Sequence, residues 1–259
     1  DSFSAGGRYL SRDAALAHAA AMIAAGADII DVGGESTRPG AAKVSVEAEL
    51  QRVVPVVEAL CSEFSVPVSV DTSKPEVMRA AVAAGAGMLN DVAALAAPGA
   101  LQAAVDLHHE YGVAVCLMHM QGTPRTMQAN PQYQDVVMEV RAFLLQRVKV
   151  VRNAGIAAAA IVIDPGFGFG KTLEHNLSLL HGLAELADLG CPILVGLSRK
   201  SMIEKIISSD SDDRLVGSVT LALLAVQRGA HIVRVHDVKA TADALQVLAA
   251  VDRFGEKRV

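Results

Sequence analysis

Short apolar runs alternate with longer stretches of helical periodicity along the whole chain. The short runs are rich in valine and isoleucine and end at polar residues or glycine, which is typical of buried strands. They predict strands at 27–32, 67–71, 87–91, 113–119, 160–164, 193–197 and 231–236. The longer stretches predict helices at 11–25, 45–63, 74–84, 99–111, 134–154, 173–188, 201–207, 214–228 and 239–251.

Residues that favour helix ends mark many of these boundaries. Residues with capping side chains stand at three helix starts, namely Asp13, Ser45 and Ser73. Glycines stand at five helix ends, namely Gly26, Gly85, Gly155, Gly190 and Gly229. No break in composition and no long linker divides residues 1–259, so we expect one α/β domain. Repeated strand-then-helix units predict a parallel sheet covered by helices.

Two closures of such a sheet compete, an open doubly wound sheet and a (β/α)₈ barrel. An open sheet gathers its site at one reversal of strand order, whereas a barrel points every strand end at one mouth. Nearly every predicted strand ends in a polar residue, namely Asp31, Asp71, Asn90, His119, Asp164, Arg234 or His236. This pattern favours the barrel. Only seven strands are visible, so the first strand is expected upstream of Asp1, leading into residues 1–7.

Composition narrows the possible partners. Apolar residues make up 52% of the 259 residues, but aromatic residues only 3%, and tryptophan is absent. Together with a net charge of −5, this argues against nucleic acid as a partner, and a phosphate site must be local. Three well-separated cysteines form neither a zinc motif nor a disulfide framework, which fits the cytoplasm. No apolar run is long enough to span a membrane.

The polar segment 35–40, Glu-Ser-Thr-Arg-Pro-Gly, directly follows a predicted buried strand and two glycines. Arg38 carries a forked cation that suits a phosphate or a carboxylate. A surface loop with a solvated arginine is the alternative.

Basic residues gather at the last two predicted strands. Arg234 and His236 share one face of their strand, because side chains alternate along a strand. The preceding strand leads into Lys200 and Ser201 at a helix start, and barrels commonly bind phosphate in this region. The pattern predicts an anion site, with ordinary salt-bridged strand ends as the alternative.

Acceptor side chains end the opposite strands. Asp71, Asn90 and Asp164 follow apolar runs, so buried carboxylates there must be paired or hydrogen-bonded. Two carboxylates and an amide in one cavity suit a heterocycle with several N–H donors, because a carboxylate can accept two parallel hydrogen bonds. A divalent-metal site and capping of loops within the barrel are alternatives.

The glycine-rich segment 164–172 has the composition of a nucleotide loop but not its spacing. The P-loop pattern would need glycine where Pro165 stands, and the third glycine comes one residue early for a dinucleotide loop. We instead expect the glycines to let the backbone lie against a ligand, with Phe167 or Phe169 as an apolar wall. We interpret His119 as a histidine hydrogen-bonded inside the barrel mouth.

Taken together, these motifs resemble the dihydropteroate synthase family, the folate-pathway enzymes that sulfonamides inhibit. The resemblance extends from Asp1 to about Leu248. It is carried, in family order, by segments 1–7, 35–40, 70–72, 90–91, 118–124, 164–171, 198–201 and 234–237.

The resemblance implies a pterin-binding barrel that condenses 6-hydroxymethyl-7,8-dihydropterin diphosphate with p-aminobenzoate. The positions that match pterin contacts are Asp71, Asn90, Met118, Asp164, Phe169 and Lys200. Those matching the diphosphate site are Thr37, Arg38, Arg234 and His236. Those matching the aminobenzoate pocket are Phe3, Thr37, Pro39, Phe169, Lys200 and Ser201. The catalytic roles are implied for Asp71, Lys200, Arg234 and His236.

The implied mechanism is dissociative, with the bond to diphosphate breaking before the aryl amine attacks. The family uses Mg²⁺, but its metal-contacting asparagine would precede Asp1, so no metal ligand is assigned in this sequence. The family usually forms homodimers. Two alternatives stay open, a pterin-binding methyltransferase and a non-catalytic pterin-binding paralogue.

Overall fold

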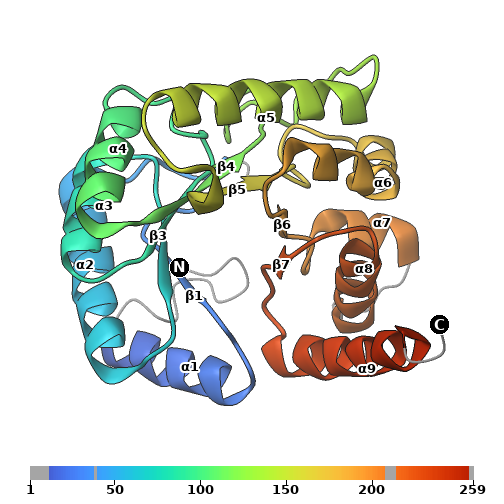
Figure 1. The fold of residues 1–259 in the computed structure, drawn as a ribbon, viewed down its shortest axis with the longest axis horizontal. Helices are drawn as coiled ribbons and strands as arrows, with labels where there is room; N and C mark the ends of the chain where they lie inside the picture. Colours follow the sequence, from blue (N-terminus) through green and yellow to red (C-terminus); the bar gives the residue numbers. More distant parts are fainter. Residues whose placement is uncertain (1–11, 38–39, 208–213, 257–259) are drawn as a thin grey trace.

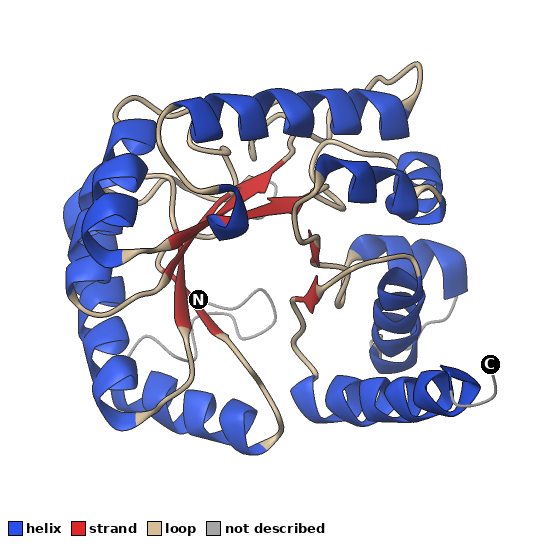
Figure 2. Cartoon of the chain, viewed as in Figure 1, coloured by secondary structure: helices blue, strands red, loops and turns tan. Residues whose placement is uncertain are grey.

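Strands lie at the centre of the molecule and helices surround them (Figures 1 and 2). The structure, a computed structural model, describes residues 12–37, 40–207 and 214–256. The strands are β1 (Ile30–Gly33), β2 (Val68–Asp71), β3 (Met88–Asp91), β4 (Ala114–Met118), β5 (Ile161–Asp164), β6 (Leu194–Val195) and β7 (Ile232–Val233). The α-helices are α1 (Arg12–Ala24), α2 (Val46–Glu63), α3 (Pro75–Ala83), α4 (Ala100–Tyr111), α5 (Val136–Asn153), α6 (Leu173–His181), α7 (Ser201–Ile207), α8 (Leu215–Gln227) and α9 (Val238–Glu256). Two 3₁₀ helices are η1 (Ala158–Ala160) and η2 (Leu183–Leu189).

The strands are parallel and follow one another in sequence order. β1 to β5 form one sheet, β6 pairs with β7, and a bridge between Ile163 and Ile193 connects the two groups. A doubly wound sheet would reverse its strand order at one point, and no reversal occurs among the described strands. The predicted parallel barrel architecture is therefore confirmed. The strand expected before Asp1 stays a prediction.

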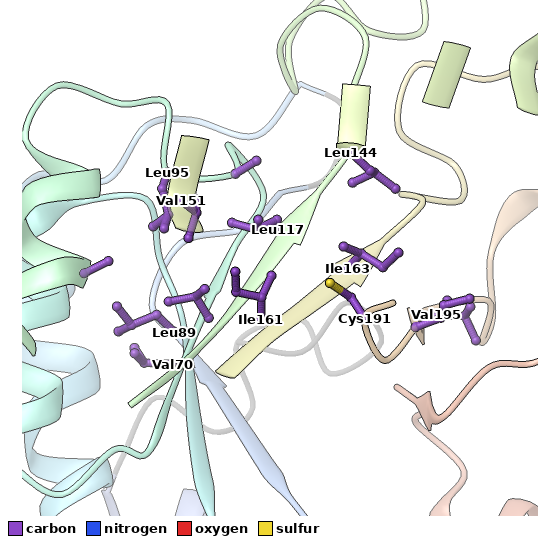
Figure 3. Packing of buried hydrophobic residues seen from close by; sticks show 14 of the residues in the cluster. Val70, Leu89, Leu95, Leu117, Leu144, Val151, Ile161, Ile163, Cys191 and Val195 are labelled. Carbon is purple, nitrogen blue, oxygen red and sulfur yellow. The ribbon is translucent and has the colours of Figure 1, made fainter. Parts of the chain in front are cut away.

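Alternate side chains of each strand face opposite layers. Leu117, Ile161 and Ile163 face outward and share a buried cluster with Leu144 and Val151 of α5 (Figure 3). The residues between them on the strands form a smaller inner cluster that contains Cys116, Val162 and Leu194, with Met88 and Ile232 packed against it. The same alternation turns Asp71, Asn90, Asp164 and Arg234 towards the inside. Strand periodicity thus places the polar residues above an apolar inner layer.

Most predicted helix boundaries lie within about two residues of the observed ones, as is usual for such boundaries. Ser45 caps α2, accepting a hydrogen bond from the Ala48 N–H at 3.2 Å. The five glycines predicted to end helices all have positive φ, as a left-handed helix terminus requires. Among the described helices, none is long and apolar enough to cross a membrane.

Ser73 was a wrong prediction for a helix cap. The residue before α3 is Lys74, which makes no side-chain capping bond, and Pro75 opens the helix. The Ser73 hydroxyl instead donates to the buried carboxylate of Asp91, which also accepts from the backbone N–H groups of Ala93 and Leu95. The Ser73 hydroxyl is therefore used in a tertiary hydrogen bond to Asp91 and is not available as a cap. Pro75 has the φ that the first turn of a helix requires, so α3 begins without a side-chain cap.

The prediction of a single helix at 173–188 is also wrong. The structure divides it at Gly182 into α6 and the 3₁₀ helix η2. A Cβ at Gly182 would lie 3.0 Å from Val137 Cγ2, so α5 packs closely against the break. Glycine also has a low helix propensity, which explains why the chain changes its winding here.

Candidate active site

An arginine held between two aspartates lies at the centre of the strand ends. Arg234 Nε donates to Asp31 Oδ2 at 2.6 Å, and its Nη2 donates to Asp71 Oδ2 at 3.1 Å. The Arg234 side chain is 47% exposed, whereas those of Asp31 and Asp71 are 15% and 10% exposed. Asn90 Nδ2 also donates to Asp31 Oδ2, at 3.3 Å. The ends of β1, β2, β3 and β7 are therefore joined by one polar network.

This network shifts the protonation of Asp71. Burial raises the pKa of Asp71 to about 7, against the opposing charge of Arg234, and the charge of Asp31 adds to the rise. The pKa of Arg234 is itself raised, chiefly by the charge of Asp31, so the guanidinium stays charged. Near neutral pH, Asp71 can therefore exchange a proton at little cost while Arg234 remains a fixed cation.

A second buried carboxylate, Asp164, ends β5. Its Oδ1 accepts a hydrogen bond from the Gly166 N–H at 2.7 Å, and burial raises the pKa of the carboxyl group. The Gly166 hydrogen bond and the nearby charge of Lys200 partly oppose that rise in pKa. Met118 stands opposite Asp164 in the register of β4 and β5. The site thus has an apolar side chain beside an acceptor at this strand pair.

The glycines after β5 pack against protein backbone. Gly166 and Gly170 have φ of +68° and +63°, and a Cβ on them would collide with the carbonyl oxygens of His119 and Gln121, respectively. The expectation that these glycines make room for a ligand is thus wrong for both positions, because the segment after β4 occupies that space. Phe167 is fully buried in the main apolar cluster, so it does not form a ligand wall.

A buried lysine holds this glycine segment in place. Lys171 is 3% exposed, and its Nζ lies 2.9 Å from Gly166 O, 3.1 Å from Phe169 O and 3.0 Å from His119 Nδ1. Burial lowers the pKa of Lys171 to about 7. Burial, with the charge of Lys171, lowers the pKa of His119 to about 3. His119 is therefore a neutral, hydrogen-bonded residue at neutral pH, as we expected from the sequence.

Lys200, Phe169 and Ser201 meet beside this segment. Lys200 Nζ donates to Phe167 O and lies 4.9 Å from the centroid of the Phe169 ring, which is a cation–π distance. Burial lowers the pKa of Lys200 to about 8, while the charge of Asp164 opposes this decrease. Lys200 and Ser201 line a cavity of about 40 Å³ with Gln128 and Gly168. Ligand pockets usually measure roughly 300–1,000 Å³, so this cavity is too small to hold a ligand of ordinary size by itself.

His236 is oriented by a serine from the neighbouring strand end. Its Nδ1 lies 3.0 Å from Ser198 Oγ, and its backbone N–H donates to the same oxygen at 3.2 Å. Ser198 is 6% exposed, so it is fixed by its surroundings. The next residue, Arg199, pairs with Asp237, which binds the segment after β6 to the segment after β7. Ser198 thus contacts both the ring and the backbone of His236.

Comparison with known proteins agrees with this geometry. A protein family described as "Pterin binding enzyme" matches residues 1–236. The dihydropteroate synthase of Escherichia coli K12 is 55% identical over 250 residues, which cover 96% of this chain and 87% of that protein. The chain belongs to the dihydropteroate synthase family of pterin-binding enzymes.

Solved structures of family members have the same fold. The Yersinia pestis dihydropteroate synthase, crystallised with a sulfonamide drug, gives a TM-score of 0.93 at 49% identity, covering 98% of this chain and 90% of that one. The Xanthomonas albilineans enzyme with 4-aminobenzoic acid gives 0.88 at 52% identity, with coverage of 96% and 88%. The same enzyme with 7,8-dihydropteroate gives 0.85 at 50% identity, with the same coverage. The resemblance inferred from the motifs is confirmed.

The predicted site residues of this family member fall into two groups. The structure gathers one group around the strand ends, consisting of Asp71, Asn90, Met118, Asp164, Phe169, Lys200, Ser201, Arg234 and His236. Phe3, Arg38 and Pro39 lie outside the described residues, and Thr37 is half-buried next to them. The binding roles of both groups stay predictions.

Sequence reasoning missed Asp31 as a site residue. It was recognised as a polar strand end, yet it makes the shortest hydrogen bond of Arg234 and also accepts from Ser69 and Asn90. Asp31 is the second residue of β1 and lies opposite Ser69 of β2, two positions before the end of the strand. Arg234 is salt-bridged, as the alternative interpretation expected, and its side chain is still half-exposed, so the anion site stays a prediction.

The described residues do not form a metal site of their own. Within 12–37, 40–207 and 214–256, no three His, Cys, Asp or Glu side chains are placed to hold one ion. Asp31 and Asp71, the carboxylates nearest the predicted diphosphate position, are occupied by Arg234. The described residues therefore do not fit Mg²⁺ unaided, and no step below passes through a metal.

Proposed function

We propose that this chain condenses 6-hydroxymethyl-7,8-dihydropterin diphosphate with p-aminobenzoate, forming 7,8-dihydropteroate and releasing pyrophosphate. The observation that carries the proposal is the arrangement of Asp71, Asn90 and Asp164 around an exposed Arg234. It combines acceptors for a donor-rich ring with a cation for its leaving group. Relatives that share 50–55% of their sequence with this chain support the same reaction by their names and bound ligands.

In this proposal the pterin ring lies over the apolar inner layer, among the strand-end acceptors. Carboxylates of Asp71 and Asp164 accept hydrogen bonds from ring N–H groups, and Asn90 can both donate and accept. Asp164 is held by the Gly166 N–H, so its orientation is fixed before the ligand arrives. Met118 supplies an apolar contact beside it. Acceptors that are already fixed reduce the entropic cost of ligand binding.

Arg234 and His236 bind the diphosphate. The carbon–oxygen bond breaks first, and its electron pair leaves with pyrophosphate, so a cation remains that is delocalised over the dihydropterin ring. A guanidinium that stays charged stabilises the negative charge where it develops. The carboxylates of Asp71 and Asp164 stabilise the electron-poor ring.

The aminobenzoate lies beside Phe169, Lys200 and Ser201, where the small cavity opens. Its amine nitrogen forms the new bond to the exocyclic methylene carbon that lost the diphosphate, and the nitrogen loses a proton. Phe169 offers an apolar face, and Lys200 offers a cation close to it. No protein nucleophile takes part, so the enzyme acts by positioning and by electrostatic stabilisation.

The decisive experiment measures pyrophosphate release by the purified full-length protein with the pterin diphosphate and Mg²⁺. Release that depends on p-aminobenzoate is expected. A methyltransferase would release none under these conditions, and a non-catalytic paralogue would bind the pterin without turnover. Either result overturns the proposed reaction.

Four further properties belong to the same proposal. Sulfonamides compete with p-aminobenzoate, supported by the drug complex of the Yersinia pestis relative. Mg²⁺ is required for turnover, and its removal by a chelator tests this. The protein forms a homodimer, supported by apolar side chains exposed on the last two helices, Val216, Val247 and Val251; sedimentation velocity tests it. It acts in the cytoplasm, supported by three cysteines that are all free thiols.

A further inference from the structure

Three ionisable side chains meet at the base of the 35–44 segment, beside the strand-end network. Lys74, which follows β2, pairs through Nζ with both Glu35 and Glu49. Glu35 follows β1, and Glu49 belongs to α2. The side chains of Lys74, Glu35 and Glu49 are 22%, 29% and 1% exposed. We call these residues the Lys74 cluster.

Glu35 connects the two described sides of that segment. Its Oε2 binds Lys74, while its Oε1 accepts the backbone N–H of Val44 at 3.1 Å. One carboxylate therefore fixes a residue nine positions further along the chain and ties both to α3. Ser36 and Thr37 follow Glu35 directly in the chain.

The packing beneath the cluster leaves little freedom. A Cβ at Gly34 would lie 2.8 Å from Glu49 Cγ and 2.9 Å from Val53 Cγ2, so α2 packs directly against the backbone. Arg52 Nη1 also donates to Gly34 O at 2.8 Å. The start of the segment is thus held by three side chains of α2 and by Lys74.

A contribution to folding stability does not by itself explain the Lys74 cluster. Glu49 is almost fully buried, and its Oε1 has no hydrogen-bond partner among the described residues. Replacing buried ion pairs by apolar residues of similar size is often neutral or stabilising, so a contribution to stability is a weak explanation for this cluster. Burial lowers the pKa of Lys74, but the hydrogen bonds and charges of Glu35 and Glu49 raise it by more. The net pKa is therefore raised, and the side chain stays a charged ammonium.

We propose that Glu35, Lys74 and Glu49 are positioning residues for the aminobenzoate half of the site. They act by fixing where the segment carrying Thr37 leaves β1, and they do not touch substrate. This inference rests on the proposed function, because Thr37 is assigned to the aminobenzoate pocket by family resemblance.

The test compares Glu35→Gln and Lys74→Met with wild type by steady-state kinetics for each substrate. Glu35→Gln keeps the side-chain volume but weakens both bonds of the carboxylate. We expect KM for p-aminobenzoate to rise about tenfold, equivalent to about 1.4 kcal/mol, while KM for the pterin diphosphate changes by less than about twofold. Arg79→Met is the matched control, since it removes an exposed α3 ion pair with Asp106. Its two KM values should equal those of wild type.

A second measurement is independent of activity. Hydrogen exchange of the peptide containing Val44 should be faster in Glu35→Gln than in wild type or Arg79→Met, because a neutral amide is a weaker acceptor for the Val44 N–H than the carboxylate. Unchanged exchange, an unchanged KM for p-aminobenzoate, or an equal rise in both KM values would overturn the inference. If wild type releases no pyrophosphate, the proposed function fails, whereas the exchange result still decides whether the cluster fixes the segment. If Lys74→Met does not fold, Glu35→Gln alone decides the kinetic comparison.

Discussion

Replacement of Lys171 by methionine should change how stability depends on pH. Lys171 is buried, and burial lowers its pKa from 10.5 to about 7, with the charge of Lys200 acting in the same direction and Asp164 opposing it. A lowered lysine pKa means that the unfolded chain binds more protons than the folded one between about pH 7 and 10.5. The free energy of unfolding therefore rises with pH across that window. Lys171→Met lacks this contribution.

The magnitude follows from the two pKa values. Each pH unit of full proton difference contributes about 1.4 kcal/mol. At pH 7 the folded lysine is about half protonated, so integration from pH 7 to pH 9 gives about 2 kcal/mol. The difference in unfolding free energy, wild type minus Lys171→Met, should become more positive by that amount.

Urea unfolding at pH 7, 8 and 9, followed by circular dichroism, measures this difference. Lys239→Met serves as a control, because Lys239 is 70% exposed and pairs only with Asp243 of its own helix among the described residues. Its difference from wild type should show no comparable slope. A Lys171 difference that stays constant within about 0.5 kcal/mol would refute the reasoning, since the lysine would then titrate alike in both states.

The remaining predictions concern the strand ends and the glycine segment. Arg234→Ala should lower kcat by at least about 100-fold, because the leaving group loses its fixed cation, and pyrophosphate release measures it; near-normal turnover by the folded variant contradicts the role. Gly166→Ala should abolish folding or cost more than about 3 kcal/mol, because its Cβ meets the His119 carbonyl oxygen. Gly190→Ala, with similar φ but nothing within 4 Å, should cost only about 1–2 kcal/mol by thermal unfolding, and equal losses would refute the steric argument.

Local periodicity explains what the sequence could predict. Strand alternation is a property of neighbouring residues, so it placed Arg234 and His236 on one face without knowledge of their partners. Asp71, Asn90 and Asp164 were placed at the barrel mouth because they end strands. Glycine at helix ends is equally local, because many helices end on a left-handed φ that glycine adopts readily. The barrel followed from the fact that nearly all strand ends were polar.

The errors involve partners that are distant in the sequence. Asp31 was missed because its bond to Arg234 spans 203 positions and exists only once the strands curve round. Ser73 does not cap a helix as predicted, because its hydroxyl donates to Asp91. Gly166 packs against the segment after β4 instead of against a ligand. Each case required knowledge of which strand ends meet, which no local pattern contains.

The position of Arg234 between Asp31 and Asp71 has a consequence for proton balance. A diphosphate that attracts the guanidinium draws it away from Asp71, whose pKa of about 7 already depends on that cation. The carboxyl group should then take up a proton as the diphosphate binds and release it as the carbon–oxygen bond breaks, so that a carboxylate faces the electron-poor ring. Binding heats measured near pH 7 should therefore vary with the ionisation enthalpy of the buffer, and affinity should weaken as the pH rises above 7. One shared arginine would thus link the charge of the leaving group to the protonation of a residue beneath the ring.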